Sequence, residues 1–202
     1  MLASINPLGE RSRNRTWWVT YSWFVAGSVF AGALLGGVLG GVGAAIDALL
    51  EPSSTAIAVT AVVLGVVALA FELHLRGVPL PTVRRQVDED WIPRYRAWVY
   101  AGGFGFQLGL GVVTVVTTST VYLTWAFALL TGSVVGGVAI GVVFGVGRAL
   151  PVLLVARADT PGRVRAALQR FSRWAPAARR VATTVTALVP VVALALALGG
   201  TA

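Results

Sequence analysis

Long uncharged stretches of apolar residues alternate along this chain with short segments that carry nearly all of its charge. Several stretches exceed the ~18 residues that a helix needs to cross the hydrocarbon core of a bilayer. The pattern therefore predicts an all-α membrane protein that forms a single polytopic domain over residues 1–202. The five predicted transmembrane helices are residues 17–46, 55–75, 97–130, 133–156 and 181–198.

The third predicted span is too long for one straight helix. Residues 97–130 contain no charged side chain. Dividing residues 97–156 into four spans would leave about 15 residues for each, too few for a ~30 Å core. We therefore expect the segment 97–130 to be tilted, broken or interrupted by a non-helical stretch.

The arginines predict how the chain is oriented. The sequence has no lysine, and every arginine except Arg148 lies before residue 16, within 76–96 or within 157–180. Basic connections stay on the cytoplasmic side, which places the N-terminus inside and the C-terminus outside the cell (inner) membrane. The net charge of +8 would then meet anionic lipid headgroups. No nucleic-acid partner is expected, because no basic soluble domain is present.

A short amphipathic pattern precedes the last predicted span. Val164, Leu168 and Phe171 recur at helical spacing, while arginines occupy the other faces of residues 162–175. This pattern favours a basic helix lying in the inner interface of the membrane. A solvated connection between spans is the alternative.

The first and fourth predicted spans resemble each other at a shift of 105 positions. The triplet Gly-Ser-Val at 27–29 recurs at 132–134, and eight of the eighteen positions from 27 to 44 are identical to their counterparts. The two spans cross the membrane in opposite directions, so they form a partial inverted repeat in which spans one and two correspond to spans four and five. The glycine ladders shared by both spans are typical of closely packed helices; they are Gly32, Gly36 and Gly40, and Gly137, Gly141 and Gly145.

This order of elements, together with the turn Gly-Val-Gly-Arg-Ala-Leu-Pro at 145–151, resembles the membrane domain of the DsbD and CcdA thiol-electron transporters of cytochrome c biogenesis, within the LysE-like transporter group. That family has two inverted repeats of three helices, each opening with a helix that carries a redox cysteine beside a proline. The segment 7–11 is similar to the loop after the family's first helix. The resemblance thus implies that the first helix is absent and that span three lacks its counterpart.

The redox chemistry of that family does not carry over to this chain. The second-repeat cysteine would fall near residues 111–116, which contain neither cysteine nor proline, and the whole sequence has no cysteine. Disulfides, thiolate nucleophiles and cysteine metal sites are excluded together. With a single histidine and no arrangement of acid, base and nucleophile, the sequence indicates no catalytic residue, no metal site, no cofactor and no enzyme.

Side-chain hydroxyls are unusually dense in the third predicted span. Inside a membrane, hydroxyls hydrogen-bond to neighbouring helices or to the carbonyl four residues back, and they can also line a polar path. Two interpretations stay open: a permeation or substrate site, and helix packing that lets a long helix bend. The candidate residues are Gln107, Thr114, Thr117, Thr118, Ser119, Thr120 and Tyr122, with Thr124 nearby.

Arg148 is a further candidate because it lies within the fourth predicted span, nine residues before Arg157. An arginine inside the membrane costs at least ~2.5 kcal/mol unless it is paired or reaches the interface. Glu72, near the inner end of span two, is the expected partner in a Glu72–Arg148 ion pair. Anion binding by Arg148 is the alternative.

Two functions fit these patterns. Inverted repeats, a broken central helix and an intramembrane arginine indicate a transporter of a small solute or ion on a scaffold that is no longer redox active. Alternatively, the absent sixth helix leaves a polar, glycine-rich face open, which indicates a non-catalytic accessory subunit or scaffold of a membrane complex. A second copy of the chain or a partner membrane protein would then cover that face.

Overall fold

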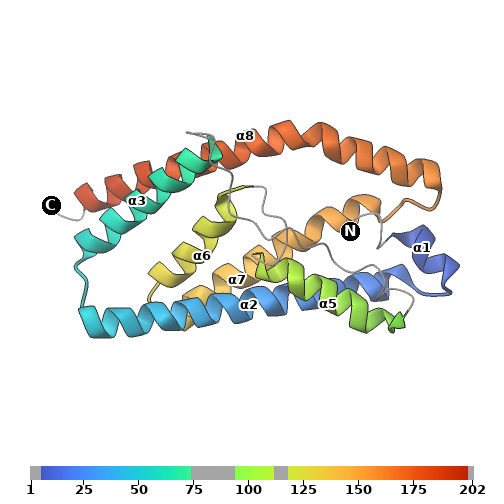
Figure 1. Ribbon diagram of the computed structural model, residues 1–202, viewed down its shortest axis with the longest axis horizontal. Helices are drawn as coiled ribbons and strands as arrows, with labels where there is room; N and C mark the ends of the chain where they lie inside the picture. Colours follow the sequence, from blue (N-terminus) through green and yellow to red (C-terminus); the bar gives the residue numbers. More distant parts are fainter. Residues whose placement is uncertain (1–5, 74–93, 112–117, 200–202) are drawn as a thin grey trace.

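The computed structural model describes residues 6–73, 94–111 and 118–199, and this part of the chain is helical without strands (Figure 1). Within these ranges, four helices are long and apolar enough to cross a membrane, and α6 is a shorter apolar helix. The predicted all-α membrane fold is confirmed. The elements are α1 (Pro7–Ser12), α2 (Trp17–Leu50), α3 (Ser54–Glu72), α5 (Ala97–Leu110), α6 (Thr120–Leu130), α7 (Val134–Ala149), the 3₁₀ helix η2 (Leu150–Val155) and α8 (Pro161–Gly199).

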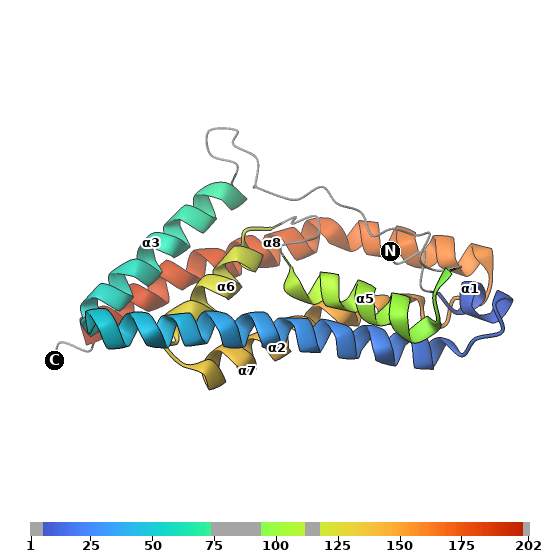
Figure 2. The same cartoon turned by 60° about the horizontal axis from the view of Figure 1, so that its bottom comes forward.

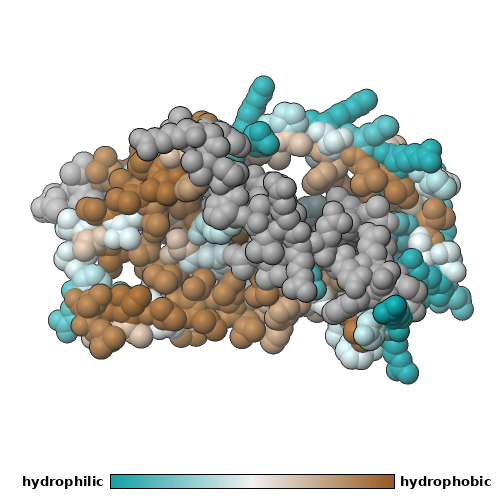
Figure 3. Space-filling model, in the orientation of Figure 1, coloured by the Kyte–Doolittle hydropathy of each residue, from teal (hydrophilic) through white to brown (hydrophobic). Residues whose placement is uncertain are grey.

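The long helices run roughly along one axis of the molecule (Figures 1 and 2). Helix α1 and the first residues of α2, α5 and α8 gather at one end, and the connection from α2 to α3 lies at the other. Figure 3 shows hydrophilic residues at the end where α8 begins and hydrophobic residues over α3 and the second half of α2. The structure therefore separates a basic end from an apolar body.

Helix α2 is the central element, and its glycines let α7 pack against it with almost no side chain between the two backbones. A Cβ added at Gly36 would overlap the carbonyl oxygen of Gly137, and one at Gly141 would overlap that of Gly32. Small residues at such positions permit the close backbone approach that holds membrane helices together. The predicted packing role of both glycine ladders is confirmed.

Helix α5 packs against the first half of α2 by the same device. A Cβ at Gly105 would meet the carbonyl of Phe24, and one at Gly109 would meet that of Ser28. Phe24, Tyr100 and Phe104 form the core of this contact, and the end of η2 completes it. This packing holds Glu10 of α1 and Tyr100 of α5 against α2 at the basic end.

The segment 97–130 contains two helices, α5 and α6, which agrees with the expectation of a broken span. Helix α5 ends at Gly111, whose φ of 71° lies in the left-handed region. A side chain there would also collide with the ring of Phe144, at 2.8 Å from the added Cβ. Glycine is required on both counts.

Helix α8 joins two segments that the sequence divided. The expected interfacial helix at 162–175 and the last span at 181–198 form one continuous helix that contains Pro176 and Pro190. The change from basic to apolar composition alters what each half contacts but does not end the helix, although neither proline can donate a backbone hydrogen bond. The second half packs on α3, where Gly65 lies against Pro190, while the first half is largely exposed.

The packing of α2 on α7 predicts different effects for two alanine substitutions in α7. Gly141→Ala should lower the unfolding temperature in micelles, because the new Cβ meets the backbone of Gly32. Gly147→Ala is the control: nothing lies within 4 Å of its added Cβ. That variant should be neutral or stabilised, by up to about 0.8–1.0 kcal/mol of helix propensity. Equal unfolding temperatures for both variants would contradict this packing.

Because the chain has no cysteine, single introduced cysteines can test its orientation. Glu51→Cys lies in the exposed turn after α2, and Ser172→Cys lies on the exposed first half of α8. Basic segments stay inside, so a membrane-impermeant maleimide should label the first in intact spheroplasts and the second only after permeabilisation. The reverse labelling pattern would show that the chain has the opposite orientation in the membrane.

Candidate functional site

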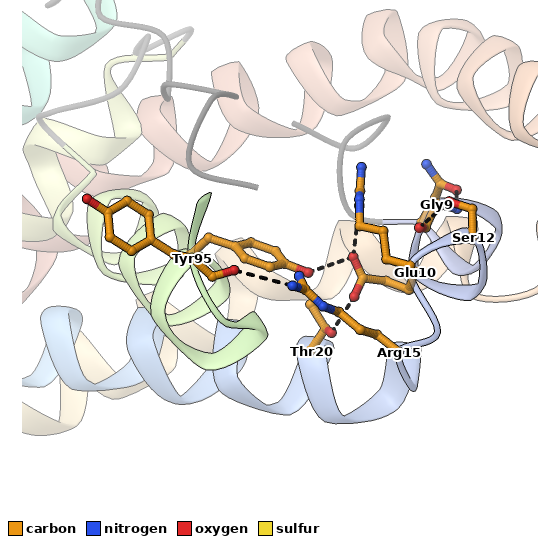
Figure 4. Close-up of polar contacts among 9 residues, drawn as sticks. Gly9, Glu10, Ser12, Arg15, Thr20 and Tyr95 are labelled. Carbon is orange, nitrogen blue, oxygen red and sulfur yellow. Dashed lines mark hydrogen bonds and ion pairs between the residues drawn. The ribbon is translucent and has the colours of Figure 1, made fainter. Parts of the chain in front are cut away.

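A fully buried carboxylate, that of Glu10, connects three helices at the basic end of the molecule (Figure 4). The Tyr100 hydroxyl of α5 donates a hydrogen bond of 2.6 Å to Glu10 Oε1, and the Thr20 hydroxyl of α2 donates one of 2.8 Å to Oε2. Arg13 forms an ion pair with Oε1 at 3.3 Å. Both carboxylate oxygens therefore have partners, as a buried charge requires.

The local sequence explains how Glu10 reaches this place. The side chain of Asn6 accepts a hydrogen bond from the Gly9 amide at 2.8 Å, and Pro7 takes the first helical position. An N-cap followed by proline is a standard helix start, so the short helix α1 forms before α2 begins. One turn of α1 then directs Glu10 toward α2 and α5.

Arg15 adds a second cation to this cluster. Its guanidinium carbon lies 5.5 Å from the centre of the Tyr100 ring, and Nη2 donates a hydrogen bond of 3.4 Å to the carbonyl oxygen of Tyr95. Two arginines and two hydroxyls thus surround one carboxylate. We name Glu10, Arg13, Arg15, Thr20 and Tyr100 the Glu10 cluster.

The family resemblance predicts a loop over residues 7–11, whereas the structure has the helix α1 there with Glu10 on it. The helix-start signal of Asn6 and Pro7 was available and would have placed Glu10 on a helix. Its partner Tyr100 is 90 positions away, and no local pattern indicates that distance.

A second buried carboxylate lies where the segment 97–130 is interrupted. Oε2 of Glu72, at the end of α3, accepts hydrogen bonds of 2.9 Å from both the amide and the hydroxyl of Ser119. Ser119 is the N-cap residue of α6, and its own side chain makes no capping hydrogen bond. Glu72 therefore acts as the cap of α6 from another helix, where a negative charge also complements the helix dipole.

The hydroxyl residues predicted from the sequence divide between packing and the interruption. Thr124 donates a hydrogen bond of 2.8 Å to the carbonyl oxygen of Thr120, within α6. The hydroxyl of Thr120 is buried and has no partner among the described residues. Gln107 lies in α5, Tyr122 in α6 and Thr118 just before Ser119, whereas Thr114 and Thr117 lie outside the described residues.

Arg148 lies in the last turn of α7, with its guanidinium carbon 5.8 Å from the centre of the Phe144 ring. Phe144 in turn packs edge-on against Trp125 of α6. Between residues that the structure describes, the ion pairs are Arg13–Glu10 and Arg163–Asp159. The predicted Glu72–Arg148 pair is not among them. Oε2 of Glu72 instead accepts the two hydrogen bonds from Ser119 described above.

The described ranges contain no group of three histidine, cysteine or acidic residues that could hold a metal ion. The chemistry available at both carboxylates is hydrogen bonding and charge stabilisation inside an apolar surround. Each carboxylate connects helices that are far apart in the sequence. Each also accepts hydrogen bonds from hydroxyl groups of the helices that it connects.

Comparison with known proteins places these features in a family. The chain matches the family described as cytochrome C biogenesis protein transmembrane region over residues 2–197. It is 37% identical over 173 residues to methylamine utilization protein MauF of Paracoccus denitrificans, covering 84% of this chain and 61% of that protein. The MauF protein of Paracoccus versutus is 32% identical over 203 residues, which cover 96% of this chain and 71% of that one.

A third MauF protein, from Methylobacillus flagellatus, is 33% identical over 156 residues, which cover 75% of this chain and 53% of that protein. The chain therefore spans between about half and 71% of the length of these relatives. No solved structure matches the chain.

The Glu10 cluster predicts that this carboxylate stabilises the fold. Glu10→Gln replaces an acceptor oxygen by a donor amide and removes the ion pair with Arg13, so it should destabilise the protein by roughly 1–3 kcal/mol. Glu51→Gln removes the same charge from an exposed turn and should stay within about 0.5 kcal/mol of the parent. Denaturant unfolding in micelles measures both variants. Equal stabilities would show that the cluster does not hold α1, α2 and α5 together.

Proposed function

The chain belongs to the family of the cytochrome C biogenesis protein transmembrane region, and on that basis we propose that it serves methylamine utilization as a non-catalytic membrane subunit. It would act by holding a partner membrane protein, without chemistry of its own. The observation that carries this proposal is a match to the family over residues 2–197 in a chain without any cysteine. The relatives reported above are all named for methylamine utilization.

The absence of cysteine decides against electron relay by this chain. Thiol–disulfide exchange requires a thiolate that attacks a disulfide sulfur, and no residue of this chain supplies one. What the scaffold still offers is its helix surfaces and its lipid contacts. A role in an assembly uses both.

The geometry of the core favours a fixed scaffold. The backbones of α2 and α7 touch through glycines along several turns, at Gly32, Gly36 and Gly40. Near the interruption of the segment 97–130, Ser119 takes part in the capping of α6 and Thr124 forms a hydrogen bond within α6. These contacts support the interpretation of the hydroxyls as packing residues.

The register of α2 against α7 supports the inverted repeat. The repeat equates Gly32 with Gly137 and Gly36 with Gly141. In the structure Gly32 touches Gly141, and Gly36 touches Gly137. Exchanging the two halves of the repeat therefore converts one of these contacts into the other, as a two-fold axis between antiparallel helices requires.

An exposed apolar stripe on α2 is the surface that a partner helix or a second copy would cover. Phe30, Leu34, Val38 and Val42 recur every four residues, and between 45% and 62% of each residue is exposed. Residues at this spacing share one helix face. In the membrane this face meets either lipid or another helix.

Transport of a small solute or ion is the second candidate function. Arg148 within α7 and the buried hydroxyl of Thr120 favour it, because polar groups inside a membrane commonly line substrate paths. The two functions make different demands on these residues, since a subunit needs the surface of the scaffold and a transporter needs its polar interior.

Replacing the MauF gene of Paracoccus denitrificans by this chain tests the proposal. We expect growth on methylamine to be restored, with growth on succinate and ammonium unchanged. A Thr120→Val, Arg148→Gln double variant should support the same growth if the chain acts as a subunit. An epitope tag verifies that each variant reaches the membrane at parental abundance.

Two outcomes would contradict the proposal. Failure of the normally inserted parent chain to restore growth would remove the link with methylamine utilization. Loss of growth in the double variant, at parental abundance and unfolding temperature, would favour transport.

A variant of the α2 stripe, Leu34→Arg with Val38→Arg, should abolish growth when a partner covers that face.

A further inference from the structure

Arginines and aromatic rings line a groove between the end of η2 and the first half of α8. Its volume is about 490 Å³, within the range of clefts that hold small ligands. The residues that matter for its chemistry are Leu154, Arg157, Arg163, Arg170, Phe171 and Trp174. None of them belongs to the Glu10 cluster or to the interruption of the segment 97–130.

The groove carries a net positive charge. Arg163 forms an ion pair of 2.6 Å with Asp159, and this guanidinium lowers the pKa of the Asp159 carboxyl below its ordinary value. The ionised carboxylate therefore offsets one of the positive charges at the groove. Arg157 and Arg170 take part in neither ion pair of the described residues. Three guanidinium groups with one carboxylate leave two positive charges for an anionic ligand.

The groove also exposes large apolar side chains, which a site for a free inorganic anion does not need. Trp174 is 61% exposed, and Phe171 and Leu154 are each exposed by more than 40%. Large exposed apolar side chains beside arginines are typical of surfaces that contact lipid, because the rings meet acyl chains while the cations meet headgroups. The ligand should therefore have an anionic head and an apolar body.

The α8 residues that line the groove share one face of the helix. Arg163, Arg170 and Trp174 follow one another at seven and four residues, which places them on one helix face. Arg165 and Arg173 do not line the groove. Of the arginines of α8, Arg163 and Arg170 line the groove, and they do so beside Trp174, whereas the other arginines of this helix lie outside its lining.

We propose that this groove binds an anionic phospholipid, whose phosphate lies among Arg157, Arg163 and Arg170 and whose acyl chains follow Leu154, Phe171 and Trp174. The geometry of guanidinium groups suits phosphate oxygens, with which they form paired hydrogen bonds. This inference goes beyond the proposed function and does not depend on it. A bound lipid would anchor the exposed first half of α8 at the basic end of the molecule.

Fluorescence quenching by brominated phosphatidylglycerol tests the site on the full chain in nanodiscs of phosphatidylcholine. The signal of Trp174 is the difference between the parent and Trp174→Phe. We expect this signal to be quenched at a low mole fraction of the brominated lipid. Arg157→Gln with Arg170→Gln should raise the half-quenching mole fraction about tenfold or more, because two charge-assisted contacts with the phosphate are lost.

The matched control removes the same amount of charge from α8, at positions outside the groove. Arg165→Gln with Arg173→Gln should leave the half-quenching mole fraction close to that of the parent. Equal shifts in both double variants would mean that only general surface charge attracts the lipid, and the proposal would fail. Relief of quenching by millimolar inorganic phosphate would instead identify a free-anion site and would likewise overturn it. Circular dichroism verifies the helix content of each variant.

Discussion

The close approach of α2 to its neighbours is the constraint on which the rest of the structure depends. In lipid, apolar side chains gain little by leaving their surroundings, so helices associate through packing and hydrogen bonds. Glycines remove the side chains that would separate the backbones, and α2 presents them toward α7 along its length, while α5 brings its own glycines against the first half of α2. Helices α3, α6 and α8 are then arranged around this three-helix core.

Two interruptions of helical structure create a second requirement, because an unsatisfied amide or an unpaired charge is expensive away from water. Glu72 meets the first by capping α6 from the end of α3. Glu10 meets the second: it joins the short helix α1 to Thr20 and Tyr100 while Arg13 balances its charge. In both places a carboxylate serves the architecture, and this agrees with a chain that keeps a redox family's scaffold without its thiols.

The two ends of the molecule differ in charge, and this difference organises its contacts. The basic end holds the Glu10 cluster and the arginines of early α8, whereas the opposite half is apolar. A membrane subunit with this polarity can be oriented by its arginines, anchored by lipid at its basic end and contacted by a partner along α2. Each of these contacts uses a different surface, so they can be made at the same time.

The sequence by itself determined the membrane class, the glycine faces and the exclusion of thiol chemistry, because these follow from composition and from spacing within one helix. It also limited the segment 97–130 to three forms, of which the broken one is found at Gly111. Only the tertiary structure decided that Tyr100 and Thr20 would meet Glu10, and that Ser119 would meet Glu72. Periodicity records which face a residue occupies on its own helix, and it holds no information about which distant residue that face will meet once the chain has folded.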